Sequence, residues 1–213
     1  HHQPRRQRQM CIRDRRAVVD RSGIDPSAID DVYFGAANQS GEDNRNVARM
    51  ASLLAGLPES VPGVTVNRLC ASGLEAINIA ARMIESGQGE VYLAGGVESM
   101  SRAPYVVSKS NAAFARSQEM FDTSIGWRFV HPKMEEMGHT DPLGITAETV
   151  AQKYGISREA QDLFALQSQQ RWASAQDRGL FADELVPVSV PQGKGEPLLV
   201  DIDEHPVSYT HLR

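Results

Sequence analysis

The sequence predicts an α/β fold in which a mostly parallel sheet is covered by helices. Three consecutive segments carry this prediction: a β-branched run at residues 64–66, a long helical pattern after Ala71, and a continuous apolar run at residues 91–94. β-branched residues favour strands, and continuous apolar strands are typical of parallel sheets covered on both faces. A strand, a helix and a strand in this order form a right-handed βαβ unit by default. We therefore expect residues 64–66 to be a buried strand, and Gly95-Gly96 to end the strand at 91–94.

The residues before this unit predict a further helix, strand and helix. A helix is expected to end over residues 16–22, where Gly23 closes it, and a strand is expected over residues 31–36. Apolar residues then recur at helical spacing over residues 47–54, and Gly56 ends that helix. This alternation extends the α/β pattern toward the start of the chain.

The helix after Ala71 carries apolar residues on most of its circumference. One apolar face is formed by Leu74, Ile77, Ala81 and Ile84, and it is widened by Ile79, Ala80 and Met83. A helix that is apolar nearly all round is a buried one. We expect this helix to be buried on most sides.

Cys70 falls at the turn between the predicted strand and this helix. Backbone N–H groups and the positive end of the helix dipole favour a thiolate there, and the thiolate is the nucleophilic form of cysteine. Ser72 and Gly73 are small enough to let a substrate carbonyl approach the same N–H groups, which could hold an oxyanion. The alternative is a buried structural cysteine that acts as a small hydrophobic residue.

From residue 104 onward, prolines, glycines and polar residues separate shorter elements. A helix is predicted to start at Gly144 or Thr146 and to run to Tyr154. Ser157 caps a longer helix that ends at Gly179. Residues 186–190 and 198–202 are predicted to form a strand pair around a glycine-containing turn.

Composition limits both size and function class. With 213 residues, of which 41% are hydrophobic, the chain can bury one fair-sized core, or one core with an appended subdomain, but not two full α/β halves. The net charge is −5, and the first sixteen residues carry six Arg against one Asp, so the remainder is acidic and offers no basic patch for nucleic acid. No apolar run approaches the roughly 18 residues that a membrane span needs.

Motif searches exclude several kinds of site. The two cysteines form no C-x-x-C pair, which argues against a zinc site or a disulfide framework and fits a reducing, cytoplasmic compartment. The nucleotide-binding patterns G-x-G-x-x-G and G-x-x-x-x-G-K-[ST] are absent, and no G-x-S-x-G surrounds Ser99. Glu98 and Ser99 are instead interpreted as polar groups that fix the loop backbone near Cys70.

Two motifs, VNRLCASGLEAI and AGGVESMSRAP, closely resemble the nucleophile region of the thiolases. The resemblance extends over residues 17–206. Residues 38–58, 125–132 and 157–175 resemble most the β-ketoadipyl-CoA and related degradative 3-oxoacyl-CoA thiolases. The resemblance to the thiolases implies a fold of two similar α/β halves with a loop domain inserted in the first. It also implies that Cys70 is the acyl-accepting cysteine.

The resemblance also implies a domain organisation and partners. Residues 17–104 would be part of the N-terminal α/β domain and residues 105–206 a truncated loop domain. Leu143 lies where many thiolases carry a methionine against the pantetheine of the substrate, although ordinary loop packing explains it equally well. Coenzyme A would be a substrate beside acyl-CoA, with no permanently bound cofactor and no metal, and the complete enzyme would be a homodimer or homotetramer.

The two ends of the chain are interpreted separately. Residues 1–16 have almost no periodic apolar content, and residues 207–213 break off abruptly after the family-like segment. Our hypothesis is that both are non-native sequence flanking a genuine gene fragment, with a native Arg-rich tail or a transit segment as the alternative.

The implied function is thiolytic cleavage of 3-oxoacyl-CoA, with 3-oxoadipyl-CoA as the candidate substrate, to acetyl-CoA and a shortened acyl-CoA through an acyl-cysteine intermediate. Thiolases also use a Gly-His-Pro histidine and a second cysteine in Cys-x-Gly-Gly-Gly, and this sequence matches neither motif. We therefore expect these 213 residues alone to be inactive and only marginally soluble. Two alternatives stay open: a condensing enzyme of the ketoacyl synthase type, and a non-catalytic module that dimerises through residues 64–70.

Overall fold

A computed structural model describes residues 6–110 and 112–203 of the chain, and the side chains from residue 13 onward within those ranges. The chain forms two compact units. The first comprises residues up to 128 together with residues 188–198, and the second comprises residues 129–187 with those from 199 onward.

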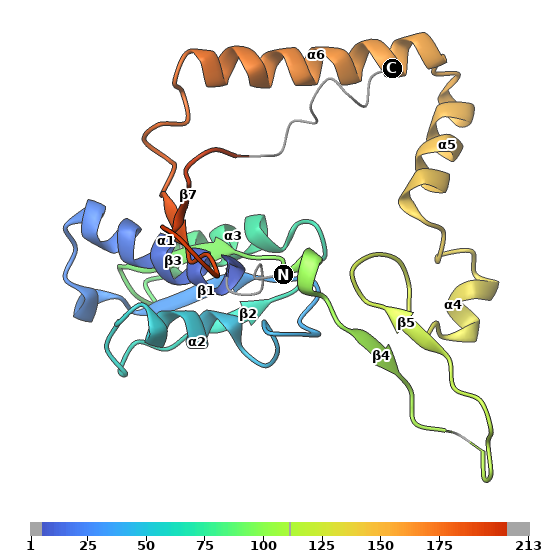
Figure 1. The fold of residues 1–213 in the computed structure, drawn as a ribbon, viewed down its shortest axis with the longest axis horizontal. Coiled ribbons are helices and arrows are strands. Elements are labelled where there is room, and N and C mark those ends of the chain that lie inside the picture. Colours follow the sequence, from blue (N-terminus) through green and yellow to red (C-terminus); the bar gives the residue numbers. More distant parts are fainter. Residues whose placement is uncertain (1–5, 111, 204–213) are drawn as a thin grey trace. The chain divides into compact units, whose positions relative to one another are not determined.

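A three-stranded parallel sheet is the centre of the first unit (Figure 1). Its strands are β1 (Asp31–Gly35), β2 (Val64–Val66) and β3 (Tyr92–Gly96), in the order β2-β1-β3. β1 pairs in parallel with both neighbours, so the helix between β2 and β3 connects two strands that lie on either side of β1. The predicted α/β class with a parallel sheet is confirmed.

Three helices accompany this sheet: α1 (Arg6–Ser22), α2 (Val47–Leu54) and α3 (Ser72–Glu85), and a short 3-10 turn, η1 (Pro26–Ala28), precedes β1. α1 begins at Arg6, and it ends as expected at Ser22, before Gly23, whose φ is 67°. Side chains alternate across β1, so Val32 and Phe34 face one side of the sheet and Tyr33 the other.

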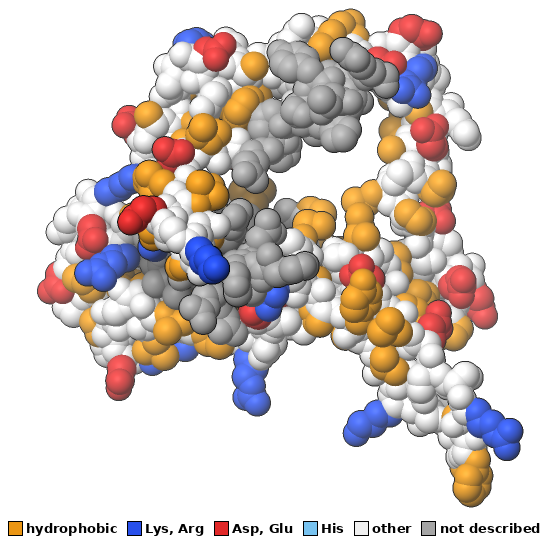
Figure 2. All heavy atoms as spheres, in the orientation of Figure 1, with side chains coloured by type: hydrophobic (Ala, Val, Ile, Leu, Met, Phe, Trp, Pro, Cys, Tyr) orange, Lys and Arg blue, Asp and Glu red, His pale blue; other side chains and the backbone are white. Residues whose placement is uncertain are grey.

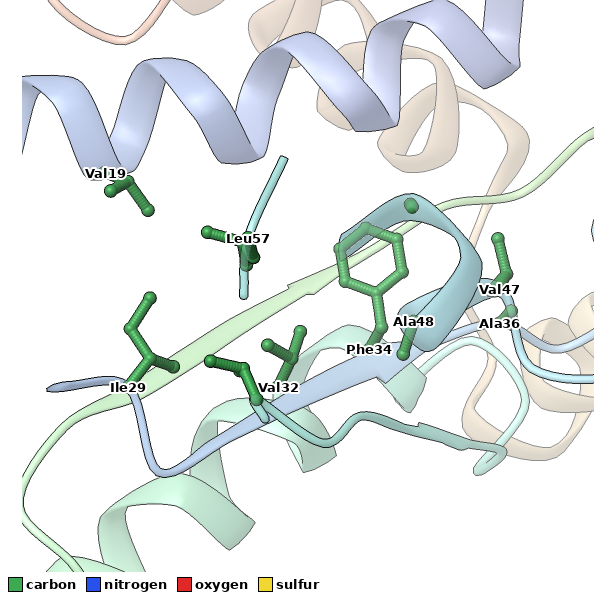
Figure 3. Packing of buried hydrophobic residues seen from close by; sticks show 10 residues of the cluster. Val19, Ile29, Val32, Phe34, Ala36, Val47, Ala48 and Leu57 are labelled. Carbon is green, nitrogen blue, oxygen red and sulfur yellow. The ribbon is translucent and has the colours of Figure 1, made fainter. Parts of the chain in front are cut away.

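The larger core cluster lies on the α1 and α2 side of β1 (Figure 3). Its buried members are Val19, Ile29, Val32, Phe34, Ala36, Val47, Ala48, Ala51, Leu57 and Val61. The buried Arg15 of α1 holds its guanidinium 3.8 Å from the centre of the Phe34 ring, which favours the cation by a cation–π interaction. On the α3 side the buried cluster is much smaller and consists of Tyr33, Ala76 and Ala80.

Two expectations for the central unit are wrong. β2 is not buried, because it is the edge strand of the sheet and Val64 is 39% exposed. α3 is not buried on most sides: it packs on the sheet through its small residues, which leaves Leu74 and Ile77 more than half exposed. β3 ends at Gly95-Gly96 as expected, and both glycines belong to the strand.

The two glycines are needed inside β3 because of their neighbours. A Cβ on Gly95 would lie 2.5 Å from Cε2 of Phe34, and one on Gly96 would lie 3.0 Å from the carbonyl oxygen of Gly35. Glycine in a strand often marks such a close approach.

The rest of the first unit contains a 3-10 turn, η2 (Met100–Arg102), and an antiparallel hairpin of β4 (Tyr105–Val107) and β5 (Met120–Asp122). Sequence reasoning did not predict this hairpin, whose strands have only three residues each. Figure 2 shows hydrophobic side chains at the surface of the hairpin, and Tyr105 and Met120 are both more than 60% exposed.

The described part of the second unit contains three helices: α4 (Pro132–Glu136), α5 (Leu143–Tyr154) and α6 (Arg158–Asp177). The predicted helix to Tyr154 begins slightly earlier than expected, and the predicted cap is confirmed because Ser157 Oγ accepts the N–H of Ala160 at 3.2 Å. α4 was not predicted. The predicted strand pair is confirmed as β6 (Val188–Val190), which belongs to the first unit, and β7 (Leu198–Val200), and both strands are shorter than expected.

Candidate active site

Cys70 lies exposed between the end of β2 and the start of α3. Ala71 is the N-cap residue of α3, and no side chain caps this helix end. Within the residues that the structure describes, the backbone N–H groups of Gly73 and Leu74 donate to no acceptor. Such unpaired N–H groups carry the positive end of the helix dipole, so a negative charge close to Cys70 is favoured.

Glycines bring this helix end directly onto the sheet. A Cβ on Gly35 would lie 2.3 Å from the carbonyl carbon of Ser72 and 2.5 Å from the nitrogen of Gly73, so no side chain fits at the end of β1. A Cβ on Gly96 would lie 3.6 Å from Cα of Gly73. The turn that carries Cys70 therefore sits at the carboxyl ends of the parallel strands, the edge at which open α/β sheets place their ligands.

Ser72 closes the turn around Cys70 through its side chain. Its Oγ accepts the N–H of Arg68 at 2.9 Å and donates to the carbonyl oxygen of Leu69 at 2.5 Å. Ser72 is buried, whereas Leu69 is exposed and has φ of 50°. The buried hydroxyl thus links the backbone N–H of Arg68 to the carbonyl oxygen of Leu69.

An exposed ion pair ties the same turn to the first turns of α3. The Nε and Nη2 atoms of Arg68 each lie 2.9 Å from one of the two carboxylate oxygens of Glu75, which is a bidentate arrangement. Arg82, about two turns further along α3, has Nη1 3.9 Å from the same carboxylate. Bidentate pairs fix orientation more strongly than single contacts do.

Glu98 anchors the neighbouring loop after β1. Its carboxylate accepts the backbone N–H groups of Ala37 at 2.8 Å and of Asn38 at 3.0 Å. Asn67 in turn donates its side-chain N–H to the carbonyl oxygen of Ala37 at 3.0 Å. The interpretation of Glu98 as a group that fixes loop backbone fits these contacts, and Ser99 beside it is buried.

The second predicted site residue lies in the other unit. Leu143 is the first residue of α5 in the second unit, and its side chain is 77% exposed. Its contact with substrate stays a prediction. Among the described residues there is no group of three or more His, Cys, Asp or Glu side chains that could hold a metal ion.

Sequence reasoning missed the residues that shape the turn, namely Gly35, Asn67 and the left-handed Leu69. Asn67 could have been found, because asparagine side chains commonly bond to the backbone N–H two residues later. Gly35 could not, because the close approach it allows is between segments far apart in sequence.

The thiolase N-terminal domain model matches residues 7–212. The chain belongs to the thiolase family. The fold described above is the N-terminal half of the thiolase fold, with its parallel sheet and its covering helices.

Characterised relatives cover most of this chain. It is 60% identical over 198 residues to the β-ketoadipyl-CoA thiolase of Pseudomonas aeruginosa and 56% identical over 197 residues to that of Acinetobacter baylyi, each match covering 92% of this chain. It is also 57% identical over 191 residues to the 3-oxoadipyl-CoA/3-oxo-5,6-dehydrosuberyl-CoA thiolase of Escherichia coli, over 90% of this chain.

A solved thiolase-family structure agrees with these matches. The crystal structure of the Bacillus anthracis acetyl-CoA acetyltransferase superposes on 98% of this chain with a TM-score of 0.83 at 32% identity. The chain spans about half the length of its relatives: 49% of the two β-ketoadipyl-CoA thiolases, 48% of the E. coli enzyme and 51% of the B. anthracis chain.

No helix among the described residues is both long enough and apolar enough to cross a membrane.

Proposed function

We propose that the complete protein carrying this segment is a degradative thiolase that cleaves 3-oxoacyl-CoA with coenzyme A. The observation that supports this most is the exposed Cys70 at the uncapped N-terminus of α3, in a chain that belongs to the thiolase family. The family match favours this reaction over that of a ketoacyl synthase-type condensing enzyme.

In the proposed reaction the Cys70 thiolate attacks the keto carbon C3 of the substrate, and its sulfur forms a bond to that carbon. Negative charge develops on the former keto oxygen, and the free N–H groups of Gly73 and Leu74 would donate hydrogen bonds to that oxygen. The bond between C2 and C3 then breaks, its electron pair stays on C2, and C2 takes up a proton, so acetyl-CoA leaves. The shortened acyl group remains on Cys70.

Coenzyme A completes the proposed cycle. Its thiol sulfur attacks the acyl carbon on Cys70, the carbon–sulfur bond to Cys70 breaks, and the thiolate is regenerated. The residues that move the protons would be the histidine and second cysteine of the C-terminal half that the thiolase resemblance implies, because neither of their motifs occurs in this sequence.

We further propose 3-oxoadipyl-CoA as the substrate, supported by identities of 55–60% to β-ketoadipyl-CoA thiolases. Turnover of 3-oxoadipyl-CoA and of acetoacetyl-CoA by the complete protein tests this directly. A higher kcat/KM for 3-oxoadipyl-CoA is expected, and a strong preference for acetoacetyl-CoA would contradict it.

Several finer assignments belong to the same proposal. Leu143 would contact the pantetheine of the substrate, and the complete enzyme would be a cytoplasmic homodimer or homotetramer without a permanent cofactor. The segment of 213 residues alone would not turn over substrate, because general acid–base assistance typically contributes about 10²- to 10⁴-fold and its histidine motif is not in this sequence.

The nucleophile is tested by Cys70→Ser in the complete protein. Cys70→Ser should abolish acetyl-CoA formation, because a serine hydroxyl is far less acidic than a thiol and does not ionise as readily to the attacking anion. Wild-type turnover in Cys70→Ser would show that the nucleophile lies elsewhere.

A further inference from the structure

We infer that Asn67 is a positioning residue for Cys70, and that it acts by holding Leu69 in a left-handed backbone conformation. This inference rests on the proposed role of Cys70 as nucleophile. It concerns a residue that touches neither the thiol nor any reacting atom.

The side-chain amide of Asn67 makes two hydrogen bonds in opposite directions. Its Oδ1 accepts the backbone N–H of Leu69 at 2.9 Å, and its Nδ2 donates to the carbonyl oxygen of Ala37 at 3.0 Å. The first bond closes the turn that leads into Cys70, and the second joins that turn to the loop after β1. One amide therefore connects two segments that are separated by thirty positions in the chain.

Leu69 is the residue that needs this support. Its φ is 50°, in the left-handed region, where a side chain with a Cβ is disfavoured and where glycine or asparagine is normally found. A residue persists in this region only when its surroundings hold it there. Because Leu69 directly precedes Cys70, its backbone angles set the direction in which the thiol leaves the turn.

The loop to which Asn67 is tied is itself fixed. Ala37 and Asn38 both donate their backbone N–H groups to the Glu98 carboxylate, and Ala36 donates to the carbonyl oxygen of Val66 at 3.1 Å. The fixed point is therefore the carboxyl edge of the sheet. Through its two hydrogen bonds, Asn67 fixes the turn before Cys70 relative to that edge.

Ser72 holds the opposite side of the same turn. It binds the N–H of Arg68 and the carbonyl oxygen of Leu69, so both peptide groups of Leu69 are bonded, one to Asn67 and one to Ser72. Without Asn67 the N–H of Leu69 loses its acceptor. Of the two side chains bonded to Leu69, only Ser72 then still holds the left-handed conformation. The turn can then relax, and Cys70 moves relative to the N-terminus of α3.

Asn67 is exposed, so its replacement opens no cavity in the core. A loss of activity can therefore be separated from a loss of folding. Asn44 provides the matched control, because it is also an exposed asparagine that donates its Nδ2 to a backbone carbonyl, that of Gly41 at 2.5 Å.

The test compares Asn67→Ala, Asn44→Ala and Cys70→Ser in the complete protein, measuring kcat and KM for thiolysis, the rate of Cys70 alkylation by iodoacetamide, and the thermal midpoint. For Asn67→Ala we expect kcat to fall about 10- to 100-fold with KM changed less than about threefold, because small misplacements of a reacting group cost rates of this order. Alkylation of Cys70 should slow in the same variant. Asn44→Ala should match the wild type in all three measurements.

A double variant tests whether Asn67 acts through the backbone conformation of Leu69. Leu69→Gly in the Asn67→Ala background should recover part of the lost kcat, because glycine adopts positive φ without a steric cost. A kcat for Asn67→Ala equal to that of the wild type, or no recovery on adding Leu69→Gly, would overturn the inference. Failure of the proposed function gives a different result, since Cys70→Ser would then retain turnover whatever Asn67→Ala does.

Discussion

Two phenylalanines show how differently the two units of this chain are built. Phe34 of β1 is 6% exposed and lies in the main core cluster, whereas Phe164 of α6 is 75% exposed. All members of both core clusters belong to the first unit. α4, α5 and α6 of the second unit contain no buried residue.

This difference shows that different interactions define the elements of the two units. In the first unit, burial and close backbone approach set where the parallel sheet and its helices lie, so the turn with Cys70 is placed by the sheet against which it packs. In the second unit the helices are defined by local signals, such as the Ser157 cap and the left-handed Gly155 at the end of α5. Local signals form a helix but do not fix its position relative to other elements.

The sharpest test of this contrast substitutes the two phenylalanines in the 213-residue chain. Phe34→Ala should lower the free energy of unfolding by about 3–5 kcal/mol, because it leaves a cavity in the core. Phe164→Ala should change it by less than about 0.5 kcal/mol, since the ring is already in water. Urea unfolding followed by circular dichroism measures both, and equal costs for the two variants would remove the distinction between the units.

A second pair of variants tests whether close approach positions α3. Gly35→Ala should destabilise the first unit by about 2–3 kcal/mol, because its Cβ would meet the backbone of Ser72 at 2.3 Å and helix and strand would have to separate. Gly73→Ala meets nothing within 4 Å and lies inside α3, so it should be neutral or stabilise by up to about 1 kcal/mol. Thermal midpoints of the two variants give the comparison. A tolerated Gly35→Ala would mean that α3 is not held against β1 as described.

The cap of α6 tests the local character of the second unit. In a synthetic peptide of residues 156–179, Ser157→Ala should cost about 1 kcal/mol of helix stability, because the N–H of Ala160 loses its acceptor. Ser168→Ala, in the middle of the helix, should instead raise the helix content, since alanine has the higher propensity. Circular dichroism measures the helix content of the wild-type peptide and of the two variants. A peptide without helix at any temperature would show that α6 depends on contacts outside itself.

The smallest expected effect is the pH dependence of the same peptide. The backbone N–H at Glu159 and the Ser157 side chain both bond its carboxylate and hold the pKa of Glu159 below its usual value of 4.5. The charged form therefore stabilises the helix above pH 4.5, and this contribution is lost as the pH falls further. Helix content should decrease on acidification by more in the wild-type peptide than in Glu159→Gln. The same decrease in both would assign the effect to other carboxyl groups.

The sequence predicts the longer elements of both units, because their signals are local, but it misses α4 and the short β4–β5 hairpin. β-branched runs and glycine ends predict the strands, and Ser157 predicts the start of α6. The position of Cys70 between strand and helix follows from the same patterns.

Burial could not be predicted in the same way. The apolar circumference of α3 indicates a helix surrounded by other elements, yet in this structure the sheet contacts it through Ala76 and Ala80, and Ile77 remains exposed. An apolar pattern shows which residues prefer burial but not which neighbour covers them. The support of Leu69 by Asn67 is also set by tertiary contacts, because the partner Ala37 comes from a distant loop.

The central claim is that Cys70, held at the N-terminus of α3, carries the acyl group during turnover. Mixing the complete protein with 3-oxoadipyl-CoA in the absence of coenzyme A, followed by acid quenching and peptide mass spectrometry, measures this directly. Cleavage between C2 and C3 releases acetyl-CoA and leaves a succinyl group, so the account predicts succinylation of the peptide that contains Cys70. Acetyl-CoA release with the acyl group on another residue, or with none on the protein, would contradict it.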